Sequence, residues 1–241
     1  MKASKYNFFY YFIVISVVLI ASVIGSFSHF IIDYAVSVDS GAMDHPRSLT
    51  VVLDAGHGGE DGGAVGHDGT LEKDLNLILC YQIRDILNSQ GINVVMTREE
   101  DRLLYKDSEN IKGRRKQYDL RNRVNIAKEC DDALFVSIHM NKFPEEKYSG
   151  LQVYYSRNNK DSKNIAQSIQ SATARYLQSD NSRQIKESTG NIYLLDMLEC
   201  PAVLIECGFL SNPNECAQLN NEEYRKKLAL IISISLIENM Y

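Results

Sequence analysis

Apolar and polar positions follow two rhythms along most of the chain, and together these predict strands separated by helices. Short apolar runs predict strands over 49–53, 92–97, 133–138, 151–155, 192–195 and 202–205. Apolar residues spaced three and four positions apart predict helices over 75–87, 120–130, 165–177 and 228–237. Strands that alternate with helices favour one α/β domain of three layers, in which helices cover both faces of a twisted, mostly parallel or mixed sheet.

The first apolar segment differs from the others because it has no polar face. Residues 8–27 read FFYYFIVISVVLIASVIGSF, twenty residues without a charge, and Lys2 and Lys5 precede them. A helix of about twenty residues spans the roughly 30 Å hydrocarbon core of a bilayer. The basic flank predicts an N-terminus that stays inside and a remainder that is exported. We therefore predict a signal peptide or membrane anchor over 1–27, and the length of the run favours an uncleaved anchor.

The rest of the chain divides into a linker and one folded domain. Residues 28–48 carry Ser, Gly, Asp and Pro without periodicity, which predicts a linker before a domain over 49–241. With 44% hydrophobic and 24% charged residues, the chain is not disordered over its full length. Its net charge of −5 gives no support to nucleic-acid binding. Five cysteines without a CxxC pair argue against a disulfide framework.

Polar side chains follow three of the predicted strands at the point where each strand ends. His57 follows the strand over 49–53, His139 follows ALFVSI, and Glu206 follows AVLI, while Glu72 opens the helix after a glycine-rich loop. The carboxyl ends of strands are where α/β sheets gather their sites. Two imidazoles and one carboxylate suit Zn²⁺, and a second carboxylate can then act as a general base on water.

Each of these residues also has an ordinary structural explanation when it is taken singly. A lone histidine after a strand is often a hydrogen-bonded core or surface residue. Glu72 can be a first-turn acid favoured by the helix dipole, and Glu206 can pair with an arginine. The glycines of GHGGEDGG permit positive φ angles, and no GK[ST] follows them as in a phosphate loop. The spacing alone is therefore suggestive of a metal site and no more.

Six segments in order along 49–241 resemble the zinc-dependent N-acetylmuramoyl-L-alanine amidases, which trim bacterial peptidoglycan. They are VVLDAGHGGEDGGAVG, LEKDLNL, Thr97-Arg98 with Asp101, LRNRVNIA, LFVSIHMN and PAVLIECGFLSNP. The resemblance implies that His57, Glu72 and His139 bind one Zn²⁺ per chain. It also implies that Glu206 is the catalytic carboxylate.

Three positions depart from the family pattern without removing a ligand: Lys128, Met140 and Cys207. We expect Cys207 to face the core, because it alternates in side with Glu206 along the strand. The second imidazole of the glycine-rich loop, His67, is expected to face solvent or substrate. His67 and Glu60 are the next candidates for the base if Glu206 is not.

The basic residues near the motifs are expected to have structural roles. Arg98 and Arg123 are expected to pair with Asp101 or Asp119. The KGRRK run at 112–116 predicts a solvated loop, with contact to an anionic envelope polymer or a partner protein as the alternative.

The resemblance implies hydrolysis of the amide between N-acetylmuramic acid and L-alanine. An anchor joined directly to the catalytic domain is similar to the sporulation and germination amidases, which implies a role in spore cortex maturation through muramic-δ-lactam. Two alternatives stay open: a catalytically idle peptidoglycan- or partner-binding module on the same fold, and a zinc peptidase acting on peptide stems. An activating accessory protein is a further expectation, since family members are often inactive without one.

Overall fold

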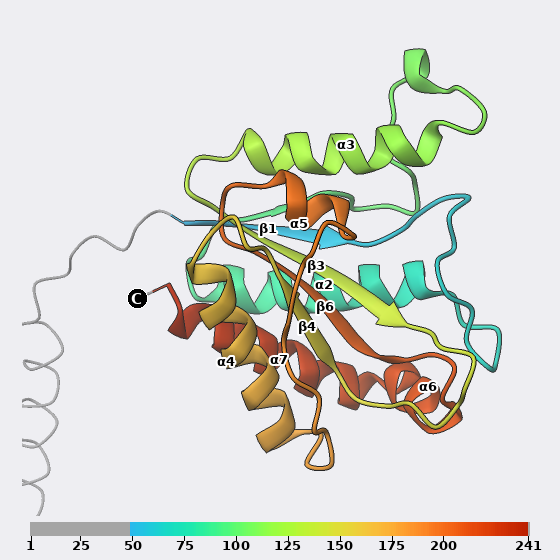
Figure 1. The fold of residues 1–241 in the computed structure, drawn as a ribbon, viewed down its shortest axis with the longest axis vertical. Helices are drawn as coiled ribbons and strands as arrows, with labels where there is room; N and C mark the ends of the chain where they lie inside the picture. The colour runs from blue at the N-terminus through green and yellow to red at the C-terminus, as the bar shows by residue number, and fades with distance from the viewer. Residues whose placement is uncertain (1–48, 241) are drawn as a thin grey trace, which may run out of the picture. The chain divides into compact units, whose positions relative to one another are not determined.

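The computed structural model describes residues 49–240, in which a sheet of six strands forms the middle layer (Figure 1). The strands are β1 Thr50–Ala55, β2 Val94–Met96, β3 Ala133–Asn141, β4 Gln152–Tyr155, β5 Lys186–Glu187 and β6 Ala202–Phe209. Their order across the sheet is β2-β1-β3-β6-β4-β5. Strands β1, β2, β3 and β6 run parallel, whereas β4 runs antiparallel to β6, so the sheet is mixed.

Helices cover both faces of this sheet, which confirms the predicted α/β class (Figure 1). One face carries α2 (Glu72–Ser89), α4 (Asp161–Tyr176), α6 (Pro213–Asn220) and α7 (Glu222–Glu238), and the other carries α3 (Arg115–Lys128) and α5 (Tyr193–Met197). A short 3₁₀ helix, η1 (Asp107–Glu109), precedes α3.

Each face of the sheet has its own apolar core, because successive side chains of a strand point to opposite faces. Leu53 of β1 packs in the larger core with Leu79 of α2, and Val52 packs in the smaller one with Val124 of α3. A cleft opens on the face of the sheet that carries the smaller core. It is lined by the start of α3, the segment 191–194 and the carboxyl ends of β1 and β3. The fold therefore places the predicted site residues at an accessible edge of the sheet.

The predicted strand over 192–195 is wrong, because this segment forms the short helix α5. A four-residue apolar run does not distinguish a buried strand from a buried helical turn. Here the helical turn brings Asp196 back to the start of the segment, where its carboxylate accepts from the N–H of Ile192 at 3.1 Å. Leu194 and Leu195 fill the smaller core from this turn.

Other differences concern short elements and boundaries. Helix α6 and the two-residue strand β5 were not predicted, and α3 begins at Arg115, ahead of the expected start at 120. The predicted anchor over 8–27 and linker over 28–48 lie outside the described residues. Among residues 49–240, none of the helices is both long enough and apolar enough to cross a bilayer.

The N-terminus of α6 gives a test of the fold. The Asn212 side chain accepts from the N–H groups of Asn214 and Glu215 at 3.0 and 3.2 Å and donates to the Glu146 carbonyl at 2.9 Å. We expect Asn212→Ala to lower the free energy of unfolding by about 1–2 kcal/mol in urea titrations, because the helix loses its cap. Asn214→Ala is the matched control, and an equal loss in both variants would contradict the capping role.

Candidate metal centre

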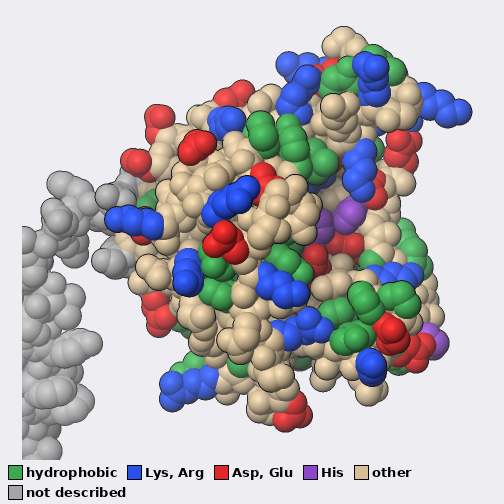
Figure 2. Space-filling view, in the orientation of Figure 1, with side chains coloured by type: hydrophobic (Ala, Val, Ile, Leu, Met, Phe, Trp, Pro, Cys, Tyr) green, Lys and Arg blue, Asp and Glu red, His purple; other side chains and the backbone are tan. Residues whose placement is uncertain are grey.

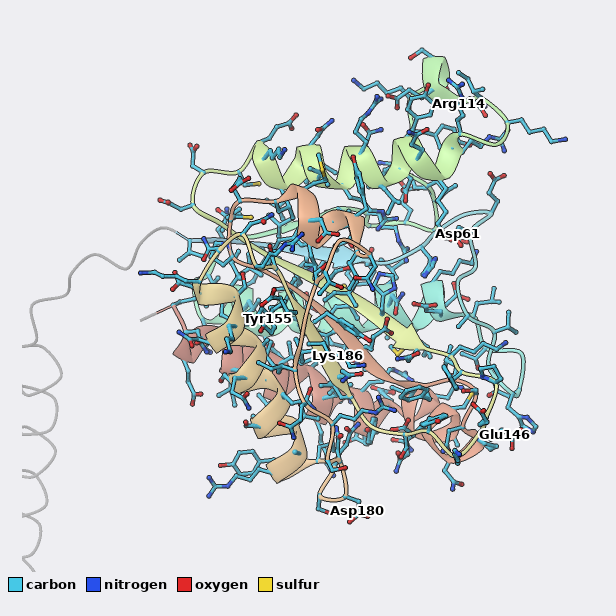
Figure 3. All side chains as sticks on the ribbon, viewed as in Figure 1. Asp61, Arg114, Glu146, Tyr155, Asp180 and Lys186 are labelled. Carbon is cyan, nitrogen blue, oxygen red and sulfur yellow. The ribbon has the colours of Figure 1, made fainter. Side chains whose placement is uncertain are left out.

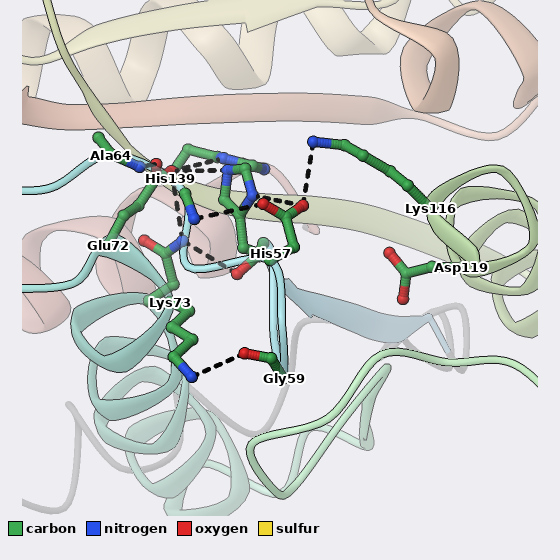
Figure 4. A network of polar contacts seen from close by, with 12 residues as sticks. His57, Gly59, Ala64, Glu72, Lys73, Lys116, Asp119 and His139 are labelled. Atoms are coloured by element: carbon green, nitrogen blue, oxygen red, sulfur yellow. Dashed lines mark hydrogen bonds and ion pairs between the residues drawn. The ribbon is translucent and has the colours of Figure 1, made fainter. Parts of the chain in front are cut away.

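Three of the predicted site residues converge at the carboxyl ends of β1 and β3 (Figure 4). His57 follows β1, His139 lies in β3, and Glu72 is the first residue of α2. The Oε1 atom of Glu72 lies 3.3 Å from Nε2 of His57 and 2.8 Å from Nδ1 of His139. One ligand atom from each residue lies within 4.8 Å of the others. This spacing fits a single ion with metal–ligand bonds of about 2.0–2.2 Å.

The Glu72 carboxylate is fixed by backbone donors as well as by the two imidazoles. Its Oε2 accepts from the N–H of Ala64 at 2.7 Å, and its Oε1 accepts from the N–H of Met140 at 3.1 Å. Burial alone would raise the pKa of Glu72, but His139 and His57 outweigh it and hold the pKa below its usual range. The carboxylate is therefore ionised and oriented for a cation.

His57 is held in a strained backbone conformation by its surroundings. Its φ angle is +61°, in the left-handed region that non-glycine residues seldom adopt. Its Nδ1 lies 2.9 Å from a carboxylate oxygen of Asp61, and Lys116 lies 3.0 Å from the same carboxylate. Burial lowers the pKa of His57, but Asp61 and Glu72 outweigh this effect and raise the pKa to about 9.

Sequence reasoning missed Asp61, which orients one of the imidazoles. A carboxylate on the second nitrogen of a histidine fixes the ring orientation and increases the basicity of the nitrogen that faces the metal. The signal in the sequence is a carboxylate four residues after His57 in the same glycine-rich loop. Contact with His57 and Lys116 holds the pKa of Asp61 well below its usual range.

Two fully buried arginines hold the backbone that carries His57. Arg98 donates to the carbonyls of Ala55 at 2.8 Å and Gly56 at 3.1 Å. Arg123 donates to the carbonyls of Ala55 at 2.8 Å and His57 at 2.7 Å. Each arginine is only 1% exposed. Together they attach three consecutive carbonyls to the core.

The predicted pairing with an aspartate is confirmed for Arg123 and is wrong for Arg98. Arg123 pairs with Asp119 at 2.9 Å, and also with Asp54 at 2.6 Å. Arg98 binds backbone carbonyls in place of Asp101, and this aspartate lies 2.6 Å from the Nζ of Lys73. The buried guanidinium of Arg98 finds enough acceptors in the loop carbonyls and leaves the half-exposed Asp101 to a lysine.

Glu206 lies beside the candidate metal ligands on the neighbouring strand. It is the register partner of His139 between β6 and β3. Burial is the main reason that the pKa of Glu206 rises to about 7, and the charge of Glu72 adds to this effect. Its Oε2 is buried without a hydrogen-bond partner among residues 49–240, and the arginine pairing left open above is not found. A carboxylate with such a pKa suits proton transfer near neutral pH.

The remaining candidates are not part of the group formed by His57, Glu72 and His139. His67 is exposed to solvent, as expected, and Cys207 is fully buried in the larger core, also as expected. Glu60 pairs with Arg115 at 2.6 Å. The expectation of a solvated loop over 112–116 is wrong in part, because Arg115 and Lys116 open α3 and reach Glu60 and Asp61 of the glycine-rich loop.

The packing of Gly63 against the site gives a test with a matched control. A Cβ at Gly63 would lie 2.5 Å from Oε2 of Glu72 and 2.7 Å from Cδ2 of His57. Gly69 also has a positive φ but has nothing within 4 Å of such a Cβ. We expect Gly63→Ala to weaken Zn²⁺ binding at least about tenfold in a chelator competition assay, since it displaces two ligands. Equal affinities for Gly63→Ala and Gly69→Ala would contradict this geometry.

Comparison with known proteins agrees with the geometry. The family model described as N-acetylmuramoyl-L-alanine amidase matches residues 51–238. The chain is 41% identical over 179 residues to the germination-specific N-acetylmuramoyl-L-alanine amidase of Bacillus subtilis (strain 168), and the match covers 74% of each chain.

Solved structures give the same result. The CwlD amidase from Clostridioides difficile, in complex with the GerS lipoprotein, matches with a TM-score of 0.75 and 41% identity over 79% of this chain and 97% of that one. The amidase AmiC2 of Nostoc punctiforme matches with a TM-score of 0.68 and 28% identity over 79% of this chain and 96% of that one. With the family model, these matches show that the chain belongs to the N-acetylmuramoyl-L-alanine amidase family.

Proposed function

We propose that this chain hydrolyses the amide bond between the lactyl group of N-acetylmuramic acid and L-alanine in peptidoglycan. The observation that carries the proposal is the buried Oε2 of Glu206, which has no hydrogen-bond partner within residues 49–240 and lies beside the candidate ligands His57, Glu72 and His139. Zn²⁺ bound by these three residues would supply a Lewis acid that polarises the amide carbonyl and lowers the pKa of water.

In this mechanism Glu206 moves the proton. Its pKa of about 7 allows the carboxylate to accept a proton from the attacking water. The same carboxyl group then gives the proton to the nitrogen of L-alanine, because an amine anion is a poor leaving group. Asp61 keeps the His57 ring oriented throughout, and the backbone donors of Ala64 and Met140 keep the Glu72 carboxylate in place.

The biological setting is proposed from the relatives. The name of the Bacillus subtilis amidase supports a role in spore germination. We propose cortex maturation through muramic-δ-lactam as the specific step. The Clostridioides difficile amidase was solved with a lipoprotein, which supports an accessory partner for this chain as well.

We also propose export, with residues 8–27 as a membrane anchor. An idle binding module and a peptidase acting on stems are the alternatives.

The role of Glu206 is tested by Glu206→Gln. The two side chains are nearly isosteric, but the amide cannot accept the water proton, so we expect turnover of purified peptidoglycan to fall by about 10²–10⁴. Zinc content and melting temperature are expected to stay unchanged. Glu129→Gln, an exposed residue at the far end of α3, is the matched control.

The products separate the alternatives. Mass spectrometry detects stem-free muramic acid only after amidase cleavage, whereas a peptidase shortens the stems. Normal turnover by a folded, zinc-loaded Glu206→Gln protein would overturn the mechanism, and loss of zinc would make Glu206 a ligand.

Export and anchoring are tested by proteolysis of intact protoplasts that express the full chain. We expect added protease to remove the domain over 49–241 while a fragment that contains 8–27 stays with the membrane, since the lysines precede the apolar run. Complete protection of the domain would contradict the orientation. Recovery of the domain only as a trimmed, soluble species would show a cleaved signal peptide.

A further inference from the structure

Two basic side chains near Glu206 have no acidic partner among residues 49–240. Arg183 lies just before β5, and Lys186 is the first residue of β5. Neither forms an ion pair within this part of the chain. In Figure 3, Lys186 is labelled on the segment that runs beside β4, and Asp61 is labelled in the glycine-rich loop that follows β1. In the orientation of Figure 1, Figure 2 shows separate Lys and Arg side chains around a group of His and acidic side chains.

Strand register places Lys186 on the face of the sheet that carries Glu206. Gln152 of β4 lies opposite Glu206, and Tyr154 lies opposite Leu204, a residue that lines the cleft. Directly opposed residues share a face of the sheet. Lys186 is in turn the register partner of Tyr154, and its Nζ lies 5.8 Å from the centre of the Tyr154 ring. A continuous strip thus extends from Glu206 to Lys186.

Arg183 is fixed in place at the side of this strip. Its Nε donates to the Ser149 carbonyl at 2.7 Å, and its Nη1 donates to Oε1 of Gln152 at 3.1 Å. The guanidinium lies over the Phe209 ring, 4.5 Å from its centre. Its Nη2 makes no hydrogen bond within residues 49–240. A guanidinium held on one edge and open on the other is preorganised to bind a carboxylate.

We propose that Arg183 and Lys186 form a subsite for a carboxylate of the peptide stem, on the leaving-amine side of Glu206. This rests on the proposed function, in which Glu206 delivers a proton to the L-alanine nitrogen. The stem must then leave past Glu206, and the residues that follow L-alanine carry carboxylates. An extended residue spans at most about 3.6 Å, and opposed side chains lie about 5 Å apart. The second or third stem residue therefore reaches Gln152 and Arg183.

The test compares two soluble muramoyl peptides that differ only at the second stem residue, which has a free α-carboxylate in one and a carboxamide in the other. We expect the zinc-loaded full chain to have a roughly tenfold higher kcat/KM for the carboxylate, mainly through KM. Arg183→Gln with Lys186→Gln should reduce that preference to about one. Lys163→Gln changes an exposed residue of α4 that forms no ion pair within residues 49–240; it is the matched control and should retain the preference.

A binding measurement separates failure of the subsite from failure of the function. Calorimetry with the free stem peptides, which the reaction releases, reports on the subsite without turnover. Preferential binding of the carboxylate peptide that disappears in the double variant supports the subsite, even if neither muramoyl peptide is cleaved. Cleavage without any preference, or an equal loss for both peptides in a folded double variant, overturns it. Lys186→Gln alone keeps the test valid if Arg183→Gln fails to fold.

Discussion

The geometry of the site depends on two buried guanidinium groups that bind backbone carbonyls. Arg98 and Arg123 together hold the carbonyls of Ala55, Gly56 and His57. Removing an arginine from water costs several kcal/mol unless its donors are satisfied, so each of these bonds is needed. These bonds hold residues 55–57 in place, and His57 therefore keeps a left-handed backbone conformation that is otherwise unfavourable for a residue other than glycine.

The charges beneath the site balance within the same network. Arg123 faces the buried carboxylates of Asp54 and Asp119, and the Ser137 hydroxyl donates to Asp54 at 2.6 Å. Burial would raise the pKa of Asp54, but Arg123 above all keeps it below its usual range. Asp54 is therefore paired beneath the site, whereas the buried Oε2 of Glu206 has no hydrogen-bond partner within residues 49–240, where the proposed chemistry needs it.

The sequence predicted the elements whose pattern depends on the chain alone. Strands β1, β3 and β6 are apolar on both faces, so the strands that carry His139 and Glu206 and precede His57 could be recognised without a structure, although β1, β3 and β6 run on to Ala55, Asn141 and Phe209, beyond their predicted ends. The structure of the segment over 192–195 could not be predicted, because a helical turn and a strand of that length have the same run of apolar residues. Asp61 and Arg183 were missed for a different reason. Asp61 lies only four residues after His57, but hydrophobic periodicity does not report a contact within an irregular loop, and Arg183 reaches Gln152 through a long-range contact that no local pattern encodes.

The central claim is that the fold preorganises two imidazoles and one carboxylate to hold a single Zn²⁺. X-ray absorption at the zinc edge of the loaded full chain tests it most directly, because imidazole rings scatter with a distinct outer-shell pattern. The account predicts nitrogen and oxygen neighbours at about 2.0–2.2 Å, two of them imidazole, and no sulfur. In His139→Ala one imidazole contribution should disappear. A sulfur shell near 2.3 Å, or an unchanged spectrum in that variant, would contradict the account.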